Sequence, residues 1–205
     1  DGFTFDLLDH SATQLKTTTG GYGFDLSGTT GTAYLQGGAY GDFLKGGSAG
    51  DNLFGEGGND RLFGGNGADM LAGGAAKDHL YGGKGNDGLS GGLGQDHLHG
   101  GKGADVFVFG NLDTSARRSK ADTIHDFEKR DSFELLAIDA NVHKPFDQAF
   151  KFIGTNQFHE KAGELRYIKE KSDTWIMGDT DGDGKADFTI HLKGAFTLTA
   201  DYFEL

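Results

Sequence analysis

Apolar residues recur every nine positions through the first half of the chain. From Gly37 the sequence divides into eight consecutive nonapeptides, and a weaker copy begins at Gly28. The eighth position of each copy is apolar, while its two neighbours are mostly polar or small. Because neighbouring side chains along a strand face opposite sides, each copy predicts a very short strand with one inward-facing residue. These residues are Leu35, Leu44, Leu53, Leu62, Leu71, Leu80, Leu89, Leu98 and Phe107.

The sixth position of the eight better copies is always aspartate, and glycine fills much of the rest. Of the 37 glycines in the chain, 26 lie between residues 28 and 108. Such a composition is also typical of a flexible linker. A linker, however, does not require Asp and Leu to keep the same nine-residue phase. The phasing therefore favours a regular structure in which glycine supplies backbone conformations with positive φ.

The consensus G-G-x-G-x-D-x-U-x, where U is apolar, resembles the RTX (repeats-in-toxin) nonapeptide, a calcium-binding parallel repeat. The resemblance implies an all-β fold, a right-handed parallel β-roll of nonapeptide repeats. Each copy would form a six-residue loop and a three-residue strand, with two copies per coil. Copies two apart would then stack about 4.8 Å from one another.

This stacking divides the aspartates into two ladders, one on each edge of the roll. Stacked carboxylates repel unless a counterion lies between them. A hard cation that takes six or more oxygen ligands suits these gaps, so we expect roughly six Ca²⁺ ions. The glycines would bring loop carbonyls close to the ions. The predicted ligands are Asp42, Asp60, Asp78 and Asp96 in one ladder, Asp51, Asp69, Asp87 and Asp105 in the other, and the loops of Gly65, Gly67, Gly83, Gly85, Gly92, Gly94, Gly101 and Gly103.

Some copies depart from the consensus. The fourth position is Tyr40, Ala49 or Ala76 in three of them, and the second position is Glu56 in another. A Cβ atom disfavours positive φ, so we expect weaker sites near Tyr40 and Ala49. The roll should be best ordered from about Gly55 onward.

After Phe109 the chain contains few glycines and many aromatic residues. Short alternating runs predict strands near residues 123–127, 133–136, 164–168, 174–177 and 188–192, which we interpret as an antiparallel β region. A repeat array needs a cap over its last coil. We therefore divide the chain into residues 1–27 (a degenerate repeat or the remnant of an upstream domain), a β-roll over 28–108, and a C-terminal β cap over 109–205.

The cap resembles the C-terminal domain of serralysin-type metalloproteases, and related domains follow lipases and alginate epimerases exported by type I secretion. The motifs are ADVFVFGNLDTS, ADTIHDFEKRDSFELLAIDA, GDTDGDGKADFTIHLKG and LTADYFEL, in that order. The resemblance implies that Asp113 and Asp122 close the last calcium site. It also implies that the final residues are the signal for a type I secretion channel. Lys129-Arg130-Asp131 departs from the family, which has a glycine in this turn.

A second acidic motif follows in the cap. Asp179, Asp181, Asp183 and Asp187 occupy positions 1, 3, 5 and 9 of an EF-hand-like loop, with Gly184 at position 6. Position 12, normally an acidic ligand, is Ile190. The alternative interpretation is a tight hairpin turn rich in Asp and Gly.

Charge and composition exclude several functions. The net charge of −12 argues against nucleic acid and anionic membranes as partners. With no cysteine, disulfides and thiolate metal sites are impossible. The first ten residues do not resemble a Sec signal, and no apolar run is long enough for a membrane span.

We find no catalytic constellation. His159-Glu160 is not followed by the second histidine of a zinc protease motif, and there is no G-x-S-x-G. His97 and His99 lie at outward-facing repeat positions, and we expect surface residues there rather than transition-metal ligands. Arg117 and Arg118 belong to a solvated loop, or alternatively contact an acidic polysaccharide.

The resulting hypothesis is a non-catalytic calcium-binding module that folds outside the bacterial cell and carries the signal for type I secretion of a larger protein. Its partners would be calcium, the secretion machinery and an upstream catalytic or effector domain. One alternative is a glycan-binding or substrate-tethering module of a secreted polysaccharide-modifying enzyme. Another is the tail of a serralysin-like metalloprotease.

Overall fold

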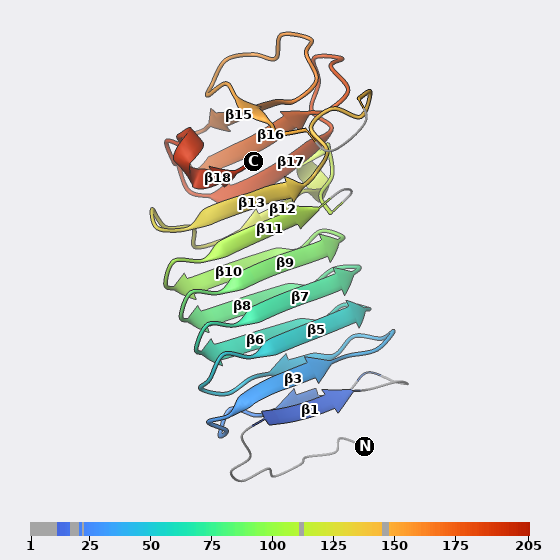
Figure 1. The fold of residues 1–205 in the computed structure, drawn as a ribbon, viewed down its shortest axis with the longest axis vertical. Helices are drawn as coiled ribbons and strands as arrows, with labels where there is room; N and C mark the ends of the chain where they lie inside the picture. The colour runs from blue at the N-terminus through green and yellow to red at the C-terminus, as the bar shows by residue number, and fades with distance from the viewer. Residues whose placement is uncertain (1–11, 17–20, 22, 111–112, 145–147) are drawn as a thin grey trace.

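The computed structural model describes residues 12–16, 21, 23–110, 113–144 and 148–205. These residues form a parallel β-roll, in which coils stack along the long axis of the molecule from β1 at one end to β15, β16 and β17 at the other (Figure 1). The predicted fold class is thus confirmed. None of the helices among the described residues is long and apolar enough to cross a membrane.

Two sheets form the opposite walls of the roll. The first has eight strands, in the order β1 (Ala12–Lys16), β3 (Thr32–Gln36), β5 (Asn52–Gly57), β7 (Met70–Ala75), β9 (Gly88–Leu93), β11 (Val106–Gly110), β13 (Ser132–Ala137) and β18 (Phe203–Glu204). The second has ten, in the order β14 (Lys151–Phe152), β15 (Glu164–Lys169), β16 (Asp173–Asp179), β17 (Phe188–Lys193), β12 (Asp122–Ile124), β10 (His97–Lys102), β8 (His79–Lys84), β6 (Arg61–Asn66), β4 (Phe43–Lys45) and β2 (Gly23–Asp25). Two 3-10 turns, Arg118–Lys120 and Ala200–Tyr202, complete the described elements.

The register explains the nine-residue repeat. Leu62 of β6 lies opposite Leu44 of β4 and Leu80 of β8, so stacked residues are 18 apart and each coil consumes two nonapeptides. The eighth-position residues face the interior, and none of them is more than 1% exposed. One column of leucines from each sheet therefore forms the thin core of the roll, as predicted.

The strands are longer than we expected. From β5 to β10 they cover six residues rather than three, because they continue through the first three positions of the next copy. Gly65 of β6 pairs with Gly83 of β8, for example. A Cβ on Gly83 would lie 2.2 Å from the carbonyl oxygen of Gly65. The glycines thus let the backbones of successive coils approach and pair, and only three residues are left for each turn.

Weaker sites near Tyr40 and Ala49 stay a prediction, but the backbone at these residues does not adopt the positive φ on which we based it. Among the described residues with a Cβ, positive φ occurs only at Glu56 (75°), Ala76 (85°) and Glu160 (56°). The loops of the first two good copies avoid positive φ altogether, and β4 there is only three residues long. The backbone therefore changes conformation at Tyr40 and Ala49, and positive φ begins with Glu56.

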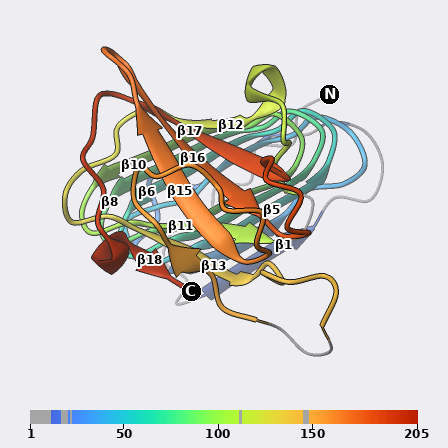
Figure 2. The same ribbon diagram turned by 90° about the horizontal axis from the view of Figure 1, so that it is seen from above.

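The C-terminal region covers the last coil (Figure 2). β15, β16 and β17 are antiparallel, as predicted. The expectation of an antiparallel region was wrong for β12 and β13, which pair in parallel with β10 and β11. They extend the two columns of inward-facing residues with Ile124 and Phe133, so they continue the roll rather than cap it.

Aromatic rings close the top of the core. Phe133 stacks against Phe127 at 4.9 Å and against Phe203 at 5.2 Å. At the other end, β1 and β2 pair in parallel with β3 and β4. Parallel stacking thus extends beyond residues 28 and 108 on both sides, and the three-part domain division stays a prediction.

Candidate metal-binding ladders

The repeat aspartates are buried and linked from coil to coil. All eight are at most 3% exposed, although a carboxylate is rarely buried without a partner. From Asp42 to Asp87, each backbone N–H donates to Oδ1 of the aspartate 18 residues later, at 2.8 Å from Asp60 to Asp78 and 2.9 Å from Asp69 to Asp87. The N–H groups of Asp96 and Asp105 donate instead to aspartates 26 residues later. The two predicted ladders therefore exist as columns of stacked carboxylates, one on each edge of the roll.

The second carboxylate oxygen has no partner over most of both ladders. Seven Oδ2 atoms are buried and accept no hydrogen bond; they belong to Asp60, Asp69, Asp78, Asp87, Asp96, Asp105 and Asp122. A buried anionic oxygen without a partner is costly, and such groups are normally paired or bound to a metal. These atoms are the strongest indication of a cation site among the described residues.

In the copies that contain Asp42 and Asp51, the second carboxylate oxygen does have a hydrogen-bond donor. Oδ2 of Asp51 accepts the backbone N–H of Gly47 at 2.6 Å, and Oδ2 of Asp42 accepts that of Gly38 at 2.8 Å. From Asp60 onward the residue at the second position, beginning with Glu56, has positive φ, and the aspartate Oδ2 has no donor. The change of loop conformation therefore coincides with the change from self-satisfied to unsatisfied carboxylates.

The glycines form a cradle around these oxygens. A Cβ on Gly55 would lie 2.3 Å from Oδ2 of Asp60 and 2.4 Å from the carbonyl oxygen of Gly73 on the next coil. Gly82 stands in the same relation to Asp87 (2.5 Å) and Gly100 (2.6 Å). First-position glycines, which the sequence analysis did not single out, thus leave room where a carboxylate and a carbonyl oxygen converge.

The predicted glycines at the second and fourth positions contact the preceding coil. A Cβ on Gly85 would lie 1.7 Å from the carbonyl oxygen of Gly67, and one on Gly103 would lie 1.5 Å from that of Gly85. Positive φ is present at Gly65, Gly67, Gly83, Gly85, Gly92, Gly101 and Gly103, but not at Gly94. Their assignment to metal sites stays a prediction.

Burial raises the pKa of the ladder carboxyls because it disfavours their charged form. The pKa is about 6 for Asp60, Asp96 and Asp105, and about 7 for Asp69 and Asp78. Neighbouring aspartates of the same ladder raise it further. Without a cation, the folded roll therefore binds protons more tightly than the unfolded chain does.

Asp113 and Asp122, which the family resemblance suggested as ligands, lie at the C-terminal end of the ladder that contains Asp96. Asp122 is fully buried and accepts the N–H of Asp96 at 2.8 Å. Burial, together with the charges of Asp96 and Asp113, raises the pKa of Asp122 to about 8. The structure thus brings Asp96, Asp113 and Asp122 together, while their role as ligands stays a prediction.

Two acids at the end of the second ladder were missed. Asp131 accepts the N–H of Asp105 at 3.0 Å, and Asp126 accepts those of Gly100 and Gly101 at 3.0 and 3.1 Å. Both carboxylates raise the pKa of Asp105 by repulsion, although burial is the largest cause. The spacing from Asp131 to the apolar Phe133, equal to that within each repeat, could have identified Asp131 in the sequence.

The EF-hand-like loop is only partly assembled. Carboxylate oxygens of Asp179, Asp181 and Asp187 lie within 4.8 Å of one another. Asp183 lies outside this group and forms an ion pair with Lys185 at 2.6 Å. Asp179 accepts backbone N–H groups of Gly182 (2.6 Å) and Gly184 (3.0 Å), as in a tight turn. Both interpretations of this loop remain, and metal binding there stays a prediction.

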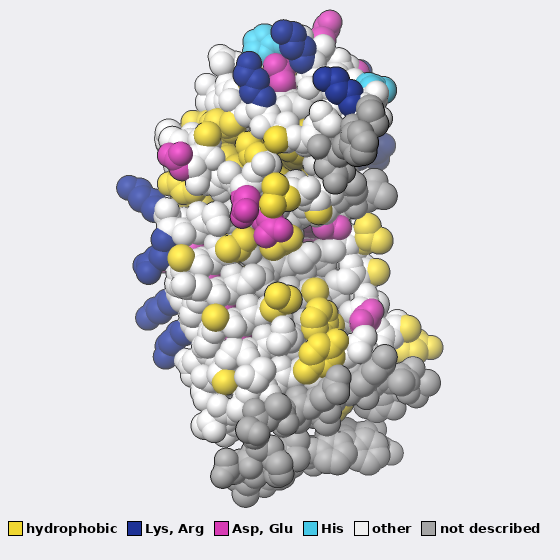
Figure 3. Space-filling view, in the orientation of Figure 1, with side chains coloured by type: hydrophobic (Ala, Val, Ile, Leu, Met, Phe, Trp, Pro, Cys, Tyr) yellow, Lys and Arg dark blue, Asp and Glu magenta, His cyan; other side chains and the backbone are white. Residues whose placement is uncertain are grey.

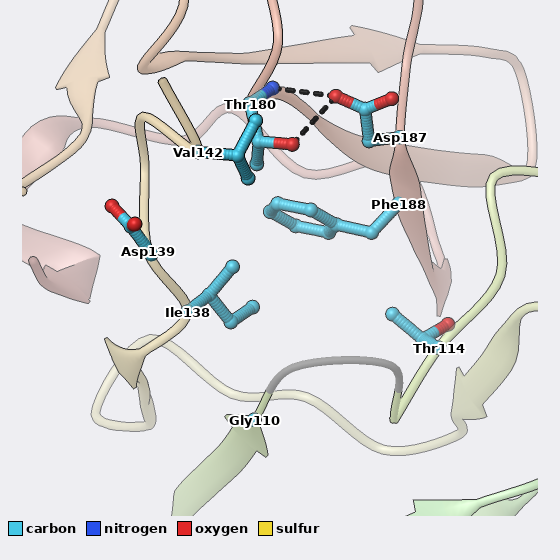
Figure 4. A pocket seen from close by; sticks show the side chains of 8 residues that line it. All are labelled: Gly110, Thr114, Ile138, Asp139, Val142, Thr180, Asp187 and Phe188. Carbon is cyan, nitrogen blue, oxygen red and sulfur yellow. Dashed lines mark hydrogen bonds between the residues drawn. The ribbon is translucent and has the colours of Figure 1, made fainter. Parts of the chain in front are cut away.

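A pocket of about 460 Å³ opens beside this loop (Figure 4). Ile138, Val142 and Phe188 give it an apolar wall, and Asp139 and Asp187 lie at its margin. Oδ2 of Asp187 accepts hydrogen bonds from the backbone N–H (2.6 Å) and the hydroxyl (2.7 Å) of Thr180. That oxygen is therefore already satisfied by the protein.

The outer faces of the two sheets differ in chemistry. On the eight-stranded sheet, the outward positions from β5 to β11 include one charged side chain, Glu56, and Figure 3 shows few charged atoms there, whereas basic side chains project along one edge. The ten-stranded sheet carries a ring stripe, which we define as Phe43, Phe63, His79, Tyr81, His97, His99 and His125. The centroids of neighbouring rings lie 4.4 to 5.3 Å apart, and most of these pairs are stacked. Sequence analysis placed His97 and His99 outward but did not predict this stacking.

A parallel β-roll built from nonapeptides, with buried carboxylates on both edges, defines the class of this protein as a β-roll repeat domain. The model of the family "Peptidase M10 serralysin C terminal" matches residues 44–203, which is most of the chain. The chain belongs to this family, as the resemblance predicted. No curated protein sequence matches it.

Several solved structures are similar in part. The AlgE6R3 subunit of the mannuronan C5-epimerase from Azotobacter vinelandii is 24% identical, with 81% of this chain and 78% of that chain covered and a TM-score of 0.46. The AlgE6R2 subunit is 25% identical, with 78% and 80% covered and a TM-score of 0.42. The extracellular lipase LipA of Serratia marcescens is 14% identical, with 86% and 40% covered and a TM-score of 0.29.

Proposed function

We propose that this domain binds calcium through its two aspartate ladders and folds when it does so. The observation that carries the proposal is the set of seven buried carboxylate oxygens without partners. Oxygen-only surroundings, with carboxylates and backbone carbonyls converging between coils, match the ligands that Ca²⁺ takes. When bound, the ion supplies positive charge that neutralises the ladder.

The protein groups have distinct tasks. Backbone N–H groups hold Oδ1 of each aspartate and so fix the direction of Oδ2. First-position glycines keep the space between Oδ2 and the carbonyl oxygen of the next coil free. Between unsatisfied carboxylates, the ladder from Asp60 to Asp122 offers three gaps and the ladder from Asp69 to Asp105 offers two. A sixth gap lies between Asp105 and Asp131, although Oδ2 of Asp131 already accepts the N–H of Glu128 at 2.7 Å. The proposal is therefore about six ions, the number predicted earlier, displaced by one coil.

Calcium binding to the native state alone stabilises it by mass action. Where calcium is scarce, ladder repulsion and the thin core leave the chain unable to offset its conformational entropy. Extracellular calcium-binding modules bind Ca²⁺ with dissociation constants in roughly the millimolar range, so roughly millimolar calcium would occupy the sites of this domain. We propose that the domain is exported unfolded through a type I secretion channel, that it folds outside the bacterial cell, and that it serves as the non-catalytic tail of a larger exoprotein.

Isothermal titration calorimetry tests the binding step. Chelator-treated chain titrated with Ca²⁺ should bind about six ions at about millimolar or lower concentration, with a large heat from coupled folding. Mg²⁺ should bind far more weakly, since it demands regular octahedral geometry and dehydrates reluctantly. Binding of no more than one Ca²⁺ would contradict the ladder assignment. Export is tested separately, by secretion of a fused reporter with and without residues 198–205.

A second candidate function is binding of an acidic polysaccharide. It is favoured by one observation, the guanidinium of Arg118 lying 4.7 Å over the ring of Trp175, which itself stacks on His191 at 4.1 Å. This array continues the ring-bearing face of the ten-stranded sheet. Arg118 also forms an ion pair with Glu170 at 2.6 Å, and a carboxylate of the polysaccharide would take the place of Glu170. Titration of the calcium-loaded domain with a polyuronate, in wild type and Arg118→Gln, tests it. Equal affinity of the wild type and Arg118→Gln for the polyuronate would contradict a role of Arg118 in polysaccharide binding.

A further inference from the structure

Five of the eight histidines lie on or beside one face of the ten-stranded sheet, away from the ladders. His97 follows the buried Asp96 and precedes the buried Leu98, so its ring points outward from β10. His125 follows the buried Ile124 of β12 in the same way. His79, His99 and His191 surround this pair. Such a concentration of imidazoles is not required by the fold, since the same positions hold Phe, Tyr, Arg and Lys in other coils.

Within this group, two ring nitrogens are close together. Nδ1 of His97 and Nε2 of His125 are 2.8 Å apart, and the ring centroids are 5.1 Å apart. A neighbouring ring supports each of them. His97 stacks on His79 at 4.8 Å, and His125 stacks on His99 at 4.4 Å with an interplanar angle of 10°. The two nitrogens are therefore pre-positioned on a supported and partly exposed surface.

We propose that His97 and His125 form a two-imidazole site for a divalent transition-metal ion of the copper or nickel class. Imidazole nitrogen is a preferred ligand of these ions, whereas Ca²⁺ takes oxygen. At about pH 7.5, above the ordinary pKa of imidazole, the rings are neutral and can coordinate. The site is chemically distinct from the oxygen-lined ladders on the edges of the roll.

The nitrogen separation indicates the geometry. Two ligands bound at 2.0–2.1 Å lie about 2.9 Å apart when they are at right angles, and about 3.4 Å apart in a tetrahedral site. The observed 2.8 Å is close to the right-angle value. The two nitrogens share a hydrogen bond in the structure, so metal binding requires the donor ring to carry its proton on its other nitrogen. Square-planar and tetragonal arrangements are those that Cu²⁺ and Ni²⁺ favour. Water would complete the coordination.

The experiment titrates the full chain, saturated with about 10 mM Ca²⁺ so that the oxygen sites are occupied, with Cu²⁺ at about pH 7.5. The variants are His97→Phe and His125→Phe, which keep a ring in the stack but remove the ligand atoms. His79→Phe is the matched control on the same face. Each of the first two should weaken Cu²⁺ binding by about tenfold or more, and the control should leave it within about twofold.

Electron paramagnetic resonance of the Cu²⁺-loaded wild type provides a measurement that needs no variant. Hyperfine coupling to two imidazole nitrogens is the expected result. Unchanged affinity in His97→Phe and His125→Phe would overturn the proposal. So would a spectrum with only oxygen ligands, even if a variant failed to fold. Calcium-dependent circular dichroism of each variant shows that it is folded before it is titrated.

Discussion

The backbone N–H of Asp78 donates a 2.8 Å hydrogen bond to Oδ1 of Asp96, one coil further along, and Oδ2 of Asp96 stays buried without a partner. The same relation joins Asp60 to Asp78 and Asp87 to Asp105. Each aspartate thus uses one oxygen to hold the ladder together and presents the other to the space between coils. The hydrogen bonds between coils therefore fix the spacing of the aspartates, and the free oxygens provide the negative charge that a cation requires.

Removal of one ladder charge should weaken the sites on both sides of it. Asp78→Asn keeps the shape of the side chain and an oxygen to accept the N–H of Asp60. It replaces the unsatisfied Oδ2 with a neutral group. We expect calcium affinity at the adjacent gaps to fall by about tenfold or more, measured by calorimetry. Asp201→Asn, at an exposed acid, is the control and should change nothing.

The position of a substitution along the ladder should matter. Oδ2 of Asp51 is satisfied by Gly47, whereas Oδ2 of Asp87 has no donor. Asp87→Asn should therefore reduce the number of bound calcium ions, and Asp51→Asn should leave that number unchanged. Equilibrium dialysis at saturating calcium distinguishes the two. Equal losses in both variants would show that the first loops rearrange to bind calcium.

Glycine-to-alanine substitutions should destabilise the domain at first-position glycines, which contact the ladder oxygens, but not at glycines with open space around them. A Cβ at Gly82 would meet Oδ2 of Asp87 and the carbonyl oxygen of Gly100, whereas one at Gly88 would meet nothing within 4 Å. Gly82→Ala should lower the calcium-loaded thermal midpoint by about 5 °C or more. Gly88→Ala should leave it unchanged or slightly higher, because alanine reduces the entropy of the unfolded chain. Thermal unfolding followed by circular dichroism measures both.

The pH dependence of stability should reverse sign when calcium is removed. Folded-state pKa values of about 6 to 8 at Asp60, Asp78 and Asp122 lie above the ordinary aspartate value of about 3.9. Without calcium, the folded state binds protons more tightly. The resulting stabilisation is complete below about pH 4 and is lost as the pH rises through about 6 to 8.

In chelator, the folded fraction should therefore be larger at about pH 5 than at about pH 8. With saturating calcium, protons compete with the ion for the same carboxylates, and the thermal midpoint should fall as the pH is lowered. Two thermal series, one with calcium and one with chelator, test this. Parallel pH trends in the two series would contradict the assignment of the ion to these carboxylates.

The roll itself could be predicted from the sequence because its core requires only one inward residue per nonapeptide. The regular spacing of Leu44, Leu62 and Leu80 therefore specifies the register of every coil. Strand length could not be obtained in this way. Pairing through glycines such as Gly65 and Gly83 depends on the close approach of two backbones, which leaves no hydrophobic signal.

Beyond the repeats, the sequence pattern was less informative. β12 and β13 continue the roll, but Asp122 and Asp131 stand outside the nine-residue phase because loops of irregular length separate them from the last repeat. The sequence also gave no indication that positive φ begins at Glu56, because a glutamate rarely adopts a φ of 75°. Sequence analysis expected weaker sites near Tyr40 and Ala49 because of positive φ, which the backbone does not adopt there.

Far-UV circular dichroism of the intact chain with and without calcium tests the central claim most directly. Chain dialysed against a chelator at about pH 8, where the ladder carboxyls tend to lose their protons, should show the spectrum of a largely unfolded polypeptide. Addition of millimolar calcium should restore the β-sheet spectrum, and equal magnesium should not. An unchanged β-sheet spectrum in the chelator, with the same thermal midpoint before and after calcium, would contradict it.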